Sequence, residues 1–527
     1  MPDKSDNRKA IDAARQAGLL EPGLMMASAT SFALWGASAA MPYAAAAVRR
    51  PFRTAVVDDY GSLTYLQLHT RTDRVAGALR GLGIAKGDAV GLMCRNHRGF
   101  VEANIAAAKL GARAVYVNTG LPADQLGVVA EREELRLILH DEEFSSVVAR
   151  AGVDHTVVVA PEDDPKWSFP SLDRRRRFLL PTGPGASADP VILTSGTTGV
   201  PKGARRPTSS GDAAGAAGML AAIPYRSGDT VVVAAPLFHA WGLSQHLVAA
   251  TLHGTVVLQR KFEAEGMLEL CRRHEADVLA AVPVMLTRML DTDSDVALRQ
   301  LRITATSGAP LPGDLAQRWM DRHGDHLYNM YGSTEVGQAT IAGPADLRDA
   351  PGTAGCAPLG VTLRVLGAND ETLPPGEIGE VVVESNFTFE GYTGGGTKDR
   401  RGGAMVTGDT GYLDHEGRLF ITGRADDMII SGGENLYPAG IEDTLLRYPG
   451  VREVAVVGVA DDTLGQRVRA VLVVDPGVTA KKLKAHAKRE LATYEVPKEF
   501  LFVAELPRNA TGKILRRQLA ELPAKPR

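Results

Sequence analysis

The chain has 527 residues, of which 44% are hydrophobic and 23% are charged, and its formal net charge is -3. This length exceeds what one hydrophobic core normally supports, so we expect at least two domains. The small net charge gives no indication of a nucleic acid or another polyanion as a partner. The three cysteines, Cys94, Cys271 and Cys356, are far apart and odd in number. They argue against a disulfide framework or a CxxC metal site and predict a reducing compartment, the cytoplasm.

Residues 1–50 are expected to form an N-terminal extension. Residues 24–47 carry no charged side chain, and the stretch is long enough to be considered as a membrane span. It is, however, rich in Ala and Ser and is interrupted by Gly36 and Pro42. We therefore favour one or two helices packed on the body of the protein. Peripheral contact with a membrane or a partner is the second interpretation, and a true membrane span is the least favoured.

From Ala55 to about Ala160, short apolar runs alternate with helical patterns. Such alternation predicts a largely parallel sheet with helices on its faces. The expected strands are 55–57, 89–93, 114–117 and 137–139, and the expected helices are 71–82 and 98–110.

The stretch 194–203 has the composition of an anion-binding loop. It follows the strand-like run 191–193 and contains four hydroxyl side chains, three glycines and Lys202. Glycines let backbone N–H groups approach a ligand and form a concave anion site. The hydroxyls and the ammonium add donors for phosphate oxygens. A Walker A loop is excluded, because Lys202 is followed by Gly203 and not by Ser or Thr.

This stretch resembles the phosphate loop of the adenylate-forming superfamily, which comprises acyl-CoA synthetases, luciferases and the adenylation domains of peptide synthetases. Further motifs of that family follow in the family's order, and the chain is most similar to a fatty-acid–CoA ligase. The resemblance implies an α/β fold with a large N-terminal domain, residues 1–423, of mainly parallel sheets flanked by helices. A hinge at 424–428 and a small, mobile α+β C-terminal domain at 429–527 would follow.

The resemblance also implies an ATP- and AMP-binding site. Its members would be Thr194, Ser195, Gly196, Thr197, Thr198, Gly199 and Lys202 in the phosphate loop, Gly308, Ala309 and Pro310 beside the adenine, Tyr331, Gly332, Ser333 and Thr334 in a Tyr-Gly-x-Thr-Glu motif, Asp409 on the ribose, and Arg424 on ribose or phosphate. Glu335 would hold Mg²⁺, which prefers carboxylate oxygen and phosphate ligands. Taken alone, the Tyr-Gly-Ser-Thr-Glu run could also be a helix N-cap. Asp409 and Arg424 could likewise be an ordinary ion pair.

The acyl pocket is expected just past the strand 231–235, where His239 and Trp241 follow. Ligands of open α/β sheets usually bind at such strand ends. Amino-acid-activating relatives tend to carry Asp after the corresponding Phe, whereas Phe238 is followed by His239. An α-amino acid substrate is therefore disfavoured.

In the C-terminal domain, the strand-like runs 454–459 and 468–474 and a basic helix at 480–491 are expected. By resemblance, Gly432 and Gly433 would guide the pantetheine arm of CoA, and Asp426 would be the hinge residue. Lys513 would be the catalytic lysine that reaches the acyl carboxylate and the α-phosphate. The predicted catalytic set is Lys513, Glu335, Thr198 and His239.

The resemblance implies a reaction in two steps that uses Mg²⁺. In the first step a carboxylic acid and ATP give acyl-AMP and pyrophosphate. In the second step acyl-AMP and CoA give acyl-CoA and AMP. A medium- or long-chain fatty acid is favoured, and aromatic or sterol-derived acids are alternatives. Other interpretations are a fatty acyl-AMP ligase that loads a carrier protein, a peptide-synthetase module, and a catalytically silent nucleotide-binding regulator. A homodimer and membrane contact through 24–47 are further expectations. The glycine-rich stretch Gly391–Gly403 has no functional interpretation at this stage.

Overall fold

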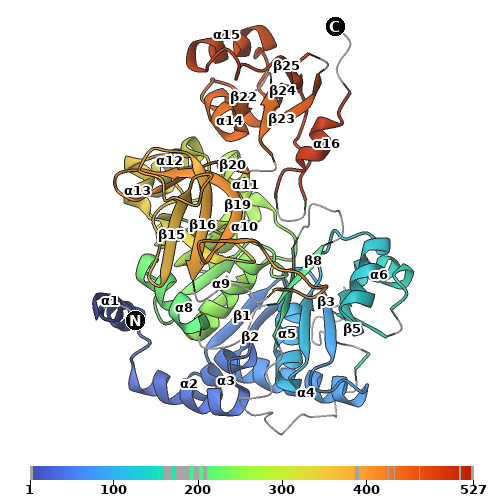
Figure 1. The fold of residues 1–527 in the computed structure, drawn as a ribbon. Coiled ribbons are helices and arrows are strands. Elements are labelled where there is room, and N and C mark those ends of the chain that lie inside the picture. The colour runs from blue at the N-terminus through green and yellow to red at the C-terminus, as the bar shows by residue number, and fades with distance from the viewer. Residues whose placement is uncertain are drawn as a thin grey trace.

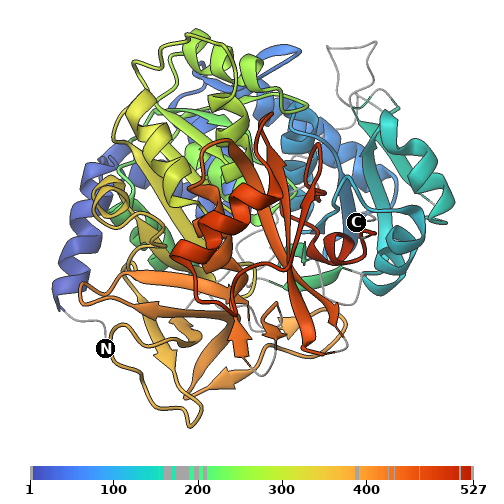
Figure 2. The ribbon, with the colours of Figure 1, turned by 90° about the horizontal axis from the view of Figure 1, so that it is seen from above.

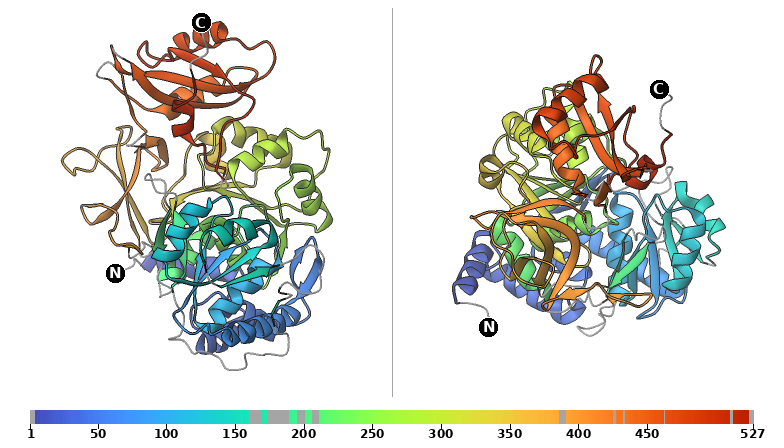
Figure 3. Two further views of the ribbon diagram at one scale, coloured as in Figure 1. Left: turned by 90° about the vertical axis from the view of Figure 1, so that its right-hand side faces the viewer. Right: turned by 45° about the horizontal axis from the view of Figure 1, so that its top comes forward.

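The computed structural model describes residues 4–523 except 154, 160–168, 170, 173–188, 195–200, 206–210, 386–390, 425–426, 432–433, 462 and 510–511. Three sheets form a large N-terminal body, and a fourth forms a C-terminal unit at one end of the molecule (Figure 1). The N-terminal helices lie at the opposite end (Figure 3). The predicted α/β fold is confirmed.

An eight-stranded sheet forms one half of the body. It is parallel in its centre, and only its two edge strands run antiparallel to their neighbours. Its strands, in spatial order, are β14 (Gly337–Ala342), β13 (Leu327–Ser333), β12 (Ile303–Ser307), β11 (Val278–Ala281), β9 (Thr230–Val233), β10 (Thr255–Leu258), β1 (Thr54–Asp58) and β2 (Gly61–Thr64).

A seven-stranded sheet forms the other half, with five parallel strands and two antiparallel strands at one edge. Its spatial order is β17 (Gly391–Tyr392), β8 (Lys202–Arg205), β7 (Val191–Thr194), β4 (Arg113–Tyr116), β3 (Ala89–Met93), β5 (Leu135–Asp141) and β6 (Thr156–Val159). The four strands predicted between residues 55 and 139 are confirmed as β1, β3, β4 and β5.

One layer of helices fills the space between the two sheets, and its side chains share a single core with both. These helices are α3 (Ala40–Arg49), α4 (Tyr65–Gly81), α5 (Arg98–Leu110) and α9 (Ala240–Thr251). The predicted helix 98–110 is confirmed as α5. Helix α4 begins earlier than predicted, because Thr64 and Gln67 form a reciprocal capping box ahead of Tyr65.

The outer faces of the two sheets are covered separately. The eight-stranded sheet packs against α10 (Ala264–Arg273), α11 (Pro283–Leu290) and α12 (Gly313–His323), with α13 (Pro344–Asp349) at β13 and β14. The seven-stranded sheet packs against α6 (Ala123–Arg132), η1 (Glu142–Phe144) and α7 (Ser145–Arg150). Strands covered on both faces read as continuous apolar runs, which explains the sequence of β3.

The third sheet is antiparallel throughout, which the sequence did not predict for the N-terminal domain. It consists of β15 (Val361–Leu366), β16 (Gly379–Ser385), β19 (Ala404–Leu413), β18 (Arg400–Arg401) and β20 (Leu419–Arg424). Several residues of β15 and β19 are only partly buried, so this sheet is more exposed than the central strands of the two large ones.

The C-terminal unit is α+β, as expected. Its sheet contains β22 (Glu434–Leu436), β21 (Ile429–Ser431), β24 (Gly465–Val474), β23 (Val451–Asp461) and β25 (Glu499–Phe502). Its helices are α14 (Pro438–Leu446), α15 (Ala480–Glu490) and α16 (Arg516–Ala520). Seen from above, this unit covers the region where the sheets of the large body meet (Figure 2).

The uncharged N-terminal stretch forms two helices, α2 (Pro22–Trp35) and α3, which confirms the favoured interpretation of residues 24–47. Helix α3 is almost entirely buried, and α1 (Lys4–Gln16) packs on α8 (Gly211–Ala222). Among the described residues, no helix has the length and hydropathy needed to cross a membrane.

A buried ion pair joins the two halves of the body. The Arg98 guanidinium at the start of α5 is paired with the Asp58 carboxylate at the end of β1, and the Arg98 N–H also donates to Asp58 at 2.8 Å. Both side chains are almost completely removed from solvent. Removing one partner of a buried ion pair leaves the other as an uncompensated buried charge, which strongly destabilises the fold.

We predict that Asp58→Ala lowers the free energy of unfolding of the N-terminal body by about 3–5 kcal/mol, because Arg98 would be left as a buried unpaired charge. Calorimetric unfolding of the full chain measures this. The matched control is Asp12→Ala, which breaks the exposed Asp12–Arg15 pair and should change stability little. Equal losses in the two variants would contradict the prediction.

Candidate active site

Three of the predicted site segments lie at the carboxyl ends of strands of the eight-stranded sheet. His239 follows β9, Gly308 follows β12, and Tyr331 lies near the end of β13. In the register of the sheet, Ser307 pairs with Met330, so the turn of Gly308, Ala309 and Pro310 lies beside Tyr331. Parallel strands present their ends, and hence any bound ligand, along one edge of a sheet.

The turn that carries His239 is fixed from the other sheet. Asn96, in the turn after β3, donates to the carbonyl of Ala235 at 2.9 Å and accepts from the Leu237 N–H at 2.9 Å. His239 is the N-cap residue of helix α9, and its Nε2 is buried without a hydrogen-bond partner among the described residues. The indole N–H of Trp241 donates to the carbonyl of Ala281 at 2.9 Å.

Tyr331, Asp409 and Arg424 form a connected group between the eight-stranded and the antiparallel sheets. The Tyr331 hydroxyl donates to Asp409 Oδ2 at 2.6 Å, and Arg424 Nη1 lies 3.6 Å from Asp409 Oδ1. Burial, and then the charge of Asp409, raise the pKa of Tyr331, so it remains a neutral donor. The pairing of Asp409 with Arg424, one of the two interpretations, is present, and it leaves further carboxylate lone pairs for ribose hydroxyls.

Gly332, Ser333, Thr334 and Glu335 lie in a strand–turn–strand connection between β13 and β14. The interpretation of this run as a helix N-cap is wrong, because β14 returns antiparallel beside β13 and no helix follows. Ser333 Oγ instead accepts from the N–H of Glu335 at 3.2 Å and stabilises the turn. Glu335 is 8% exposed.

The single carboxylate of Glu335 fits Mg²⁺, which is commonly held by one or two carboxylates together with substrate phosphates. Among the described residues there is no cluster of three or more His, Cys, Asp or Glu side chains suited to a metal ion. Any such ion would therefore depend on the oxygens of a bound nucleotide.

Lys513 reaches this group of residues from the C-terminal unit. Its loop is shaped by the Lys513 N–H, which donates to Asn509 Oδ1 at 3.0 Å, and by an isolated bridge between Arg508 and Ile514. Gly512 has φ +82°, and a Cβ at this position would lie 2.8 Å from Val284 Cγ1 of the large body. The absence of a side chain at Gly512 thus permits the loop to approach the body closely.

The charges of this group act on one another. Loss of solvation, followed by the charge of Arg424, lowers the pKa of Lys513, while Asp409 and Glu335 oppose that change. The Lys513 side chain keeps contact with solvent, although protein atoms lie around its ammonium group. Burial, and then the charge of Lys513, lower the pKa of His239 to about 3, so His239 is neutral near pH 7.

The phosphate loop is described only at its two ends. Thr194 Oγ1 donates to the carbonyl of Lys202 at 3.2 Å, and the two residues pair across β7 and β8. Ser195, Gly196, Thr197, Thr198 and Gly199 lie outside the described residues, as do the predicted hinge residue Asp426 and the predicted CoA-binding Gly432 and Gly433.

Two residues of the site were missed in the sequence. Asn96 lies in a turn without a recognised motif, and Tyr392 lies in the glycine-rich stretch. The Tyr392 hydroxyl donates to Glu335 Oε1 at 3.0 Å, although 57 positions separate the two residues. A polar residue three positions beyond the end of the buried strand β3 was the available signal for Asn96. No local signal marked Tyr392.

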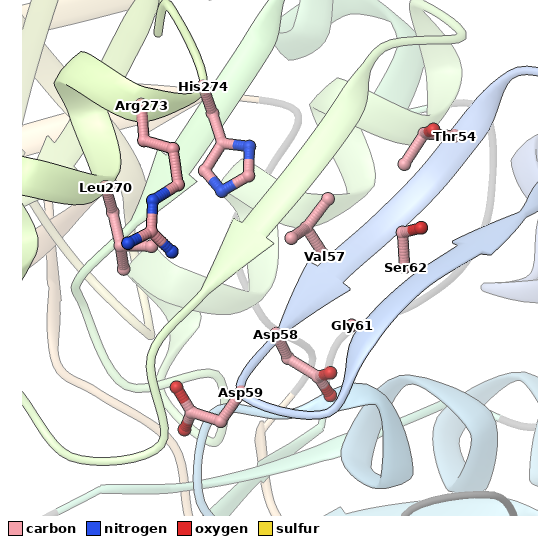
Figure 4. Close-up of a pocket in the computed structure, with 9 residues that line it drawn as sticks. All are labelled: Thr54, Val57, Asp58, Asp59, Gly61, Ser62, Leu270, Arg273 and His274. Carbon is pink, nitrogen blue, oxygen red and sulfur yellow. The ribbon is translucent and has the colours of Figure 1, made fainter.

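A separate surface pocket of about 650 Å³ lies at the β1–β2 edge. Figure 4 shows Asp58 and Asp59 at the end of β1, with Arg273 and His274 of the α10 region across from the strands. None of the predicted site residues lines it. Asp58 is already paired with Arg98, so we assign this pocket no part in the site.

The site thus defines a class: an α/β nucleotide-binding protein whose small C-terminal unit brings a lysine to the strand ends of the large body. The family model described as AMP-binding enzyme matches residues 43–393, and the model of the AMP-binding enzyme C-terminal domain matches residues 440–513. The chain therefore belongs to the AMP-binding enzyme family, and the predicted membership of the adenylate-forming superfamily is confirmed.

Curated relatives cover nearly the whole chain. A fatty acid–[acyl-carrier-protein] ligase of Streptomyces coeruleorubidus is 33% identical, over 90% of this chain and 94% of its own length. A 2-succinylbenzoate–CoA ligase of Bacillus licheniformis is 34% identical over 89% and 97%, and a feruloyl-CoA synthase of Amycolatopsis sp is 33% identical over 88% and 95%. The crystal structure of the anthranilate CoA ligase AuaEII with anthranoyl-AMP is similar, with a TM-score of 0.83 and 26% identity over 93% of this chain and 97% of that one.

We predict that the rate of acyl-AMP formation falls as pH rises, with a midpoint below the ordinary lysine pKa of 10.5, because the lowered pKa of Lys513 makes its positive charge disappear earlier. Pyrophosphate release without CoA measures this half-reaction. In Lys513→Arg, any activity that remains should not fall over the same pH range, since guanidinium stays charged. The same fall in both proteins would contradict the assignment.

Proposed function

We propose that the protein is an AMP-forming acid–CoA ligase that acts in two steps. In the first, a carboxylate oxygen of the acid bonds to the α-phosphorus of ATP, and pyrophosphate leaves. In the second, the sulfur of CoA bonds to the acyl carbon, and AMP leaves. The observation that carries the proposal is the presence of Lys513, from the C-terminal unit, in the electrostatic environment of Glu335, Asp409 and Arg424.

Repulsion between the reactants explains why a cation is needed at this position. The acid and the α-phosphate are both anionic, so catalysis depends on neutralising charge and aligning the reacting atoms. Lys513 and Lys202 would supply positive charge, and Asp409 would bind the ribose hydroxyls. Mg²⁺, when bound, supplies further charge neutralisation on the phosphates, and Glu335 would hold it.

The second step requires different groups. We propose that the C-terminal domain turns about the hinge 424–428, with Asp426 at its centre, and withdraws Lys513. Gly432 and Gly433 would then guide the thiol of CoA. Such closing motions also keep water from a reactive acyl intermediate.

The acid is proposed to be apolar beyond its carboxylate. His239 is neutral at ordinary pH, and Trp241 is uncharged, so neither offers a charge to a substrate ammonium group. A medium- or long-chain fatty acid suits this pocket, and an aromatic acid is the alternative. The relatives named above include ligases for both kinds of acid.

A second candidate is a ligase that transfers the acyl group to a carrier protein. It is favoured by the 33% identical fatty acid–[acyl-carrier-protein] ligase. The two candidates share the first step and differ only in the thiol that accepts the acyl group.

We predict that purified protein with ATP, Mg²⁺, CoA and a panel of fatty and aromatic acids forms acyl-CoA from one class of acid, as measured by mass spectrometry. Lys513→Ala should reduce acyl-AMP formation about 10²–10³-fold, since one transition-state contact to developing charge is lost. Its reaction of supplied acyl-AMP with CoA should be largely retained. Acyl-AMP without acyl-CoA would contradict the CoA assignment, and no ATP turnover with any acid would contradict the ligase assignment.

Helix α2 is proposed to contact a lipid surface. It carries no charged residue and has four exposed apolar side chains, Met25, Met26, Phe32 and Leu34, of which Met26 is 71% exposed. Several exposed apolar side chains on one helix are typical of interaction surfaces, and helices that lie in the membrane interface bury such side chains.

We predict that the protein binds phospholipid vesicles in a flotation assay and that Met26→Asp with Phe32→Asp weakens this binding without changing turnover of a water-soluble acid. Val128→Asp on α6 is the matched control, because Val128 is a similarly exposed apolar residue outside α2. Equal binding by all three proteins, or none by the wild type, would contradict the proposal.

A further inference from the structure

The glycine-rich stretch Gly391–Gly403 crosses from the antiparallel sheet to the phosphate-loop region. Its first two residues form β17, which pairs antiparallel with β8, the strand that returns from the phosphate loop. Gly391 pairs with Arg205, and Tyr392 pairs with Ala204. In Figure 1 the orange segment reaches across the body to β8. This stretch is therefore a strap between two parts of the nucleotide site.

Tyr392 contacts both ionic groups that the proposed function directs at the nucleotide. Its hydroxyl donates to Glu335 Oε1 at 3.0 Å, and Lys202 Nζ lies 5.2 Å from the centre of its ring. The first contact is a hydrogen bond to a charged acceptor, and the second has the geometry of a cation–π interaction. One side chain thus fixes the position of a carboxylate relative to an ammonium group.

The hydrogen bond from Tyr392 engages Oε1 of the Glu335 carboxylate. A carboxylate has a second oxygen and further lone pairs with which it can bind a cation.

The neighbouring residue anchors the strap. The Thr393 N–H donates to the carbonyl of Gly203 at 2.9 Å, and Thr393 Oγ1 donates to Glu133 Oε1 at 2.5 Å. Arg132 Nε donates to the same Glu133 oxygen at 2.8 Å, and Arg132 Nη1 donates to the carbonyl of Pro201 at 2.6 Å. Helix α6, the end of the phosphate loop and the strap are thereby held together.

The packing at this anchor has no spare room. A Cβ at Gly203 would lie 2.5 Å from Thr393 Oγ1 and 2.6 Å from Glu133 Oε1. A side chain at residue 203 would therefore displace the Thr393 hydroxyl and the Glu133 carboxylate from their hydrogen bond. The backbone position of Tyr392 is given by its pairing with Ala204 in β8.

We propose that Tyr392 is a positioning residue that orients Glu335 toward a nucleotide-bound divalent cation and holds Lys202 beside it. The inference rests on the proposed function, because it takes Glu335 as the carboxylate for that cation. The strap, which had no functional interpretation in the sequence, would then connect Glu335 to Lys202 at the end of the phosphate loop through Tyr392.

Two substitutions separate the two contacts. Tyr392→Phe removes the hydroxyl but keeps the ring beneath Lys202, and Tyr392→Leu removes both. Losing a hydrogen bond to a charged group should weaken binding about tenfold. We expect Tyr392→Phe to raise the Kd of ATP about tenfold in the presence of Mg²⁺ and to leave the Kd of ATP in EDTA unchanged. Tyr392→Leu should raise both.

The measurement is isothermal titration of the full-length protein with ATP, with Mg²⁺ or with EDTA, in the absence of any acid so that no turnover occurs. Titration with Mn²⁺ and ATP, followed by electron paramagnetic resonance, gives the cation affinity directly. Tyr448→Phe is the matched control, because Tyr448 packs on His486 in the C-terminal unit and does not contact the site. Its affinities should equal those of the wild type.

The inference is overturned if Tyr392→Phe binds ATP with Mg²⁺ as tightly as the wild type. It is also overturned if Tyr392→Phe weakens metal-free ATP as much as the Mg²⁺ complex, since that would indicate a purely structural role. Failure of the proposed function is a separate result. If Tyr392→Phe weakens ATP binding only in the presence of Mg²⁺, but the wild type forms no acyl-AMP, the inference is supported. The assignment of the protein as a ligase is then contradicted.

Discussion

Two residues of one turn, Asn96 and Arg98, join the two large sheets. Asn96 bonds to the chain after β9, and Arg98 pairs with Asp58 at the end of β1, while His97 Nε2 lies 2.7 Å from Asp141 Oδ1 within the seven-stranded sheet. The Gly99 N–H donates to His97 Nδ1, so the proton on Nε2 is the one given to Asp141. Buried polar groups of this kind stabilise only when every partner is present. The turn therefore fixes the distance between the sheets and the placement of His239 together.

The site built on this frame consists of charges supplied by separate parts of the chain. Glu335 comes from the eight-stranded sheet, Asp409 from the antiparallel sheet, and Lys513 from the C-terminal unit. The strap carrying Tyr392 connects Glu335 to the phosphate-loop strand β8. Two of these charges therefore belong to the large body, and the lysine belongs to the C-terminal unit.

Much of this was predictable from the sequence, because the relevant signals are local. Apolar runs marked β1, β3, β4 and β5, and contiguous motifs marked Glu335 and Lys513 as candidates. What escaped prediction depends on contacts between distant residues. The antiparallel third sheet, the partnership of Tyr392 with Glu335, and the role of Asn96 all arise from tertiary placement. The Tyr-Gly-Ser-Thr-Glu run also resembled a helix N-cap, and only the return of β14 as a strand decided against it.

The glycines of the strap illustrate why composition alone misleads. A stretch such as Gly391–Gly403 has the composition of a flexible linker. Here its first residues are paired in a sheet, and Thr393 is bonded to both Gly203 and Glu133. The pairing of β17 with β8 places Tyr392 where its hydroxyl reaches Glu335. Gly203 leaves room beside it for the Thr393 hydroxyl and the Glu133 carboxylate, so a residue that composition assigns to the phosphate loop also accommodates the anchor of the strap.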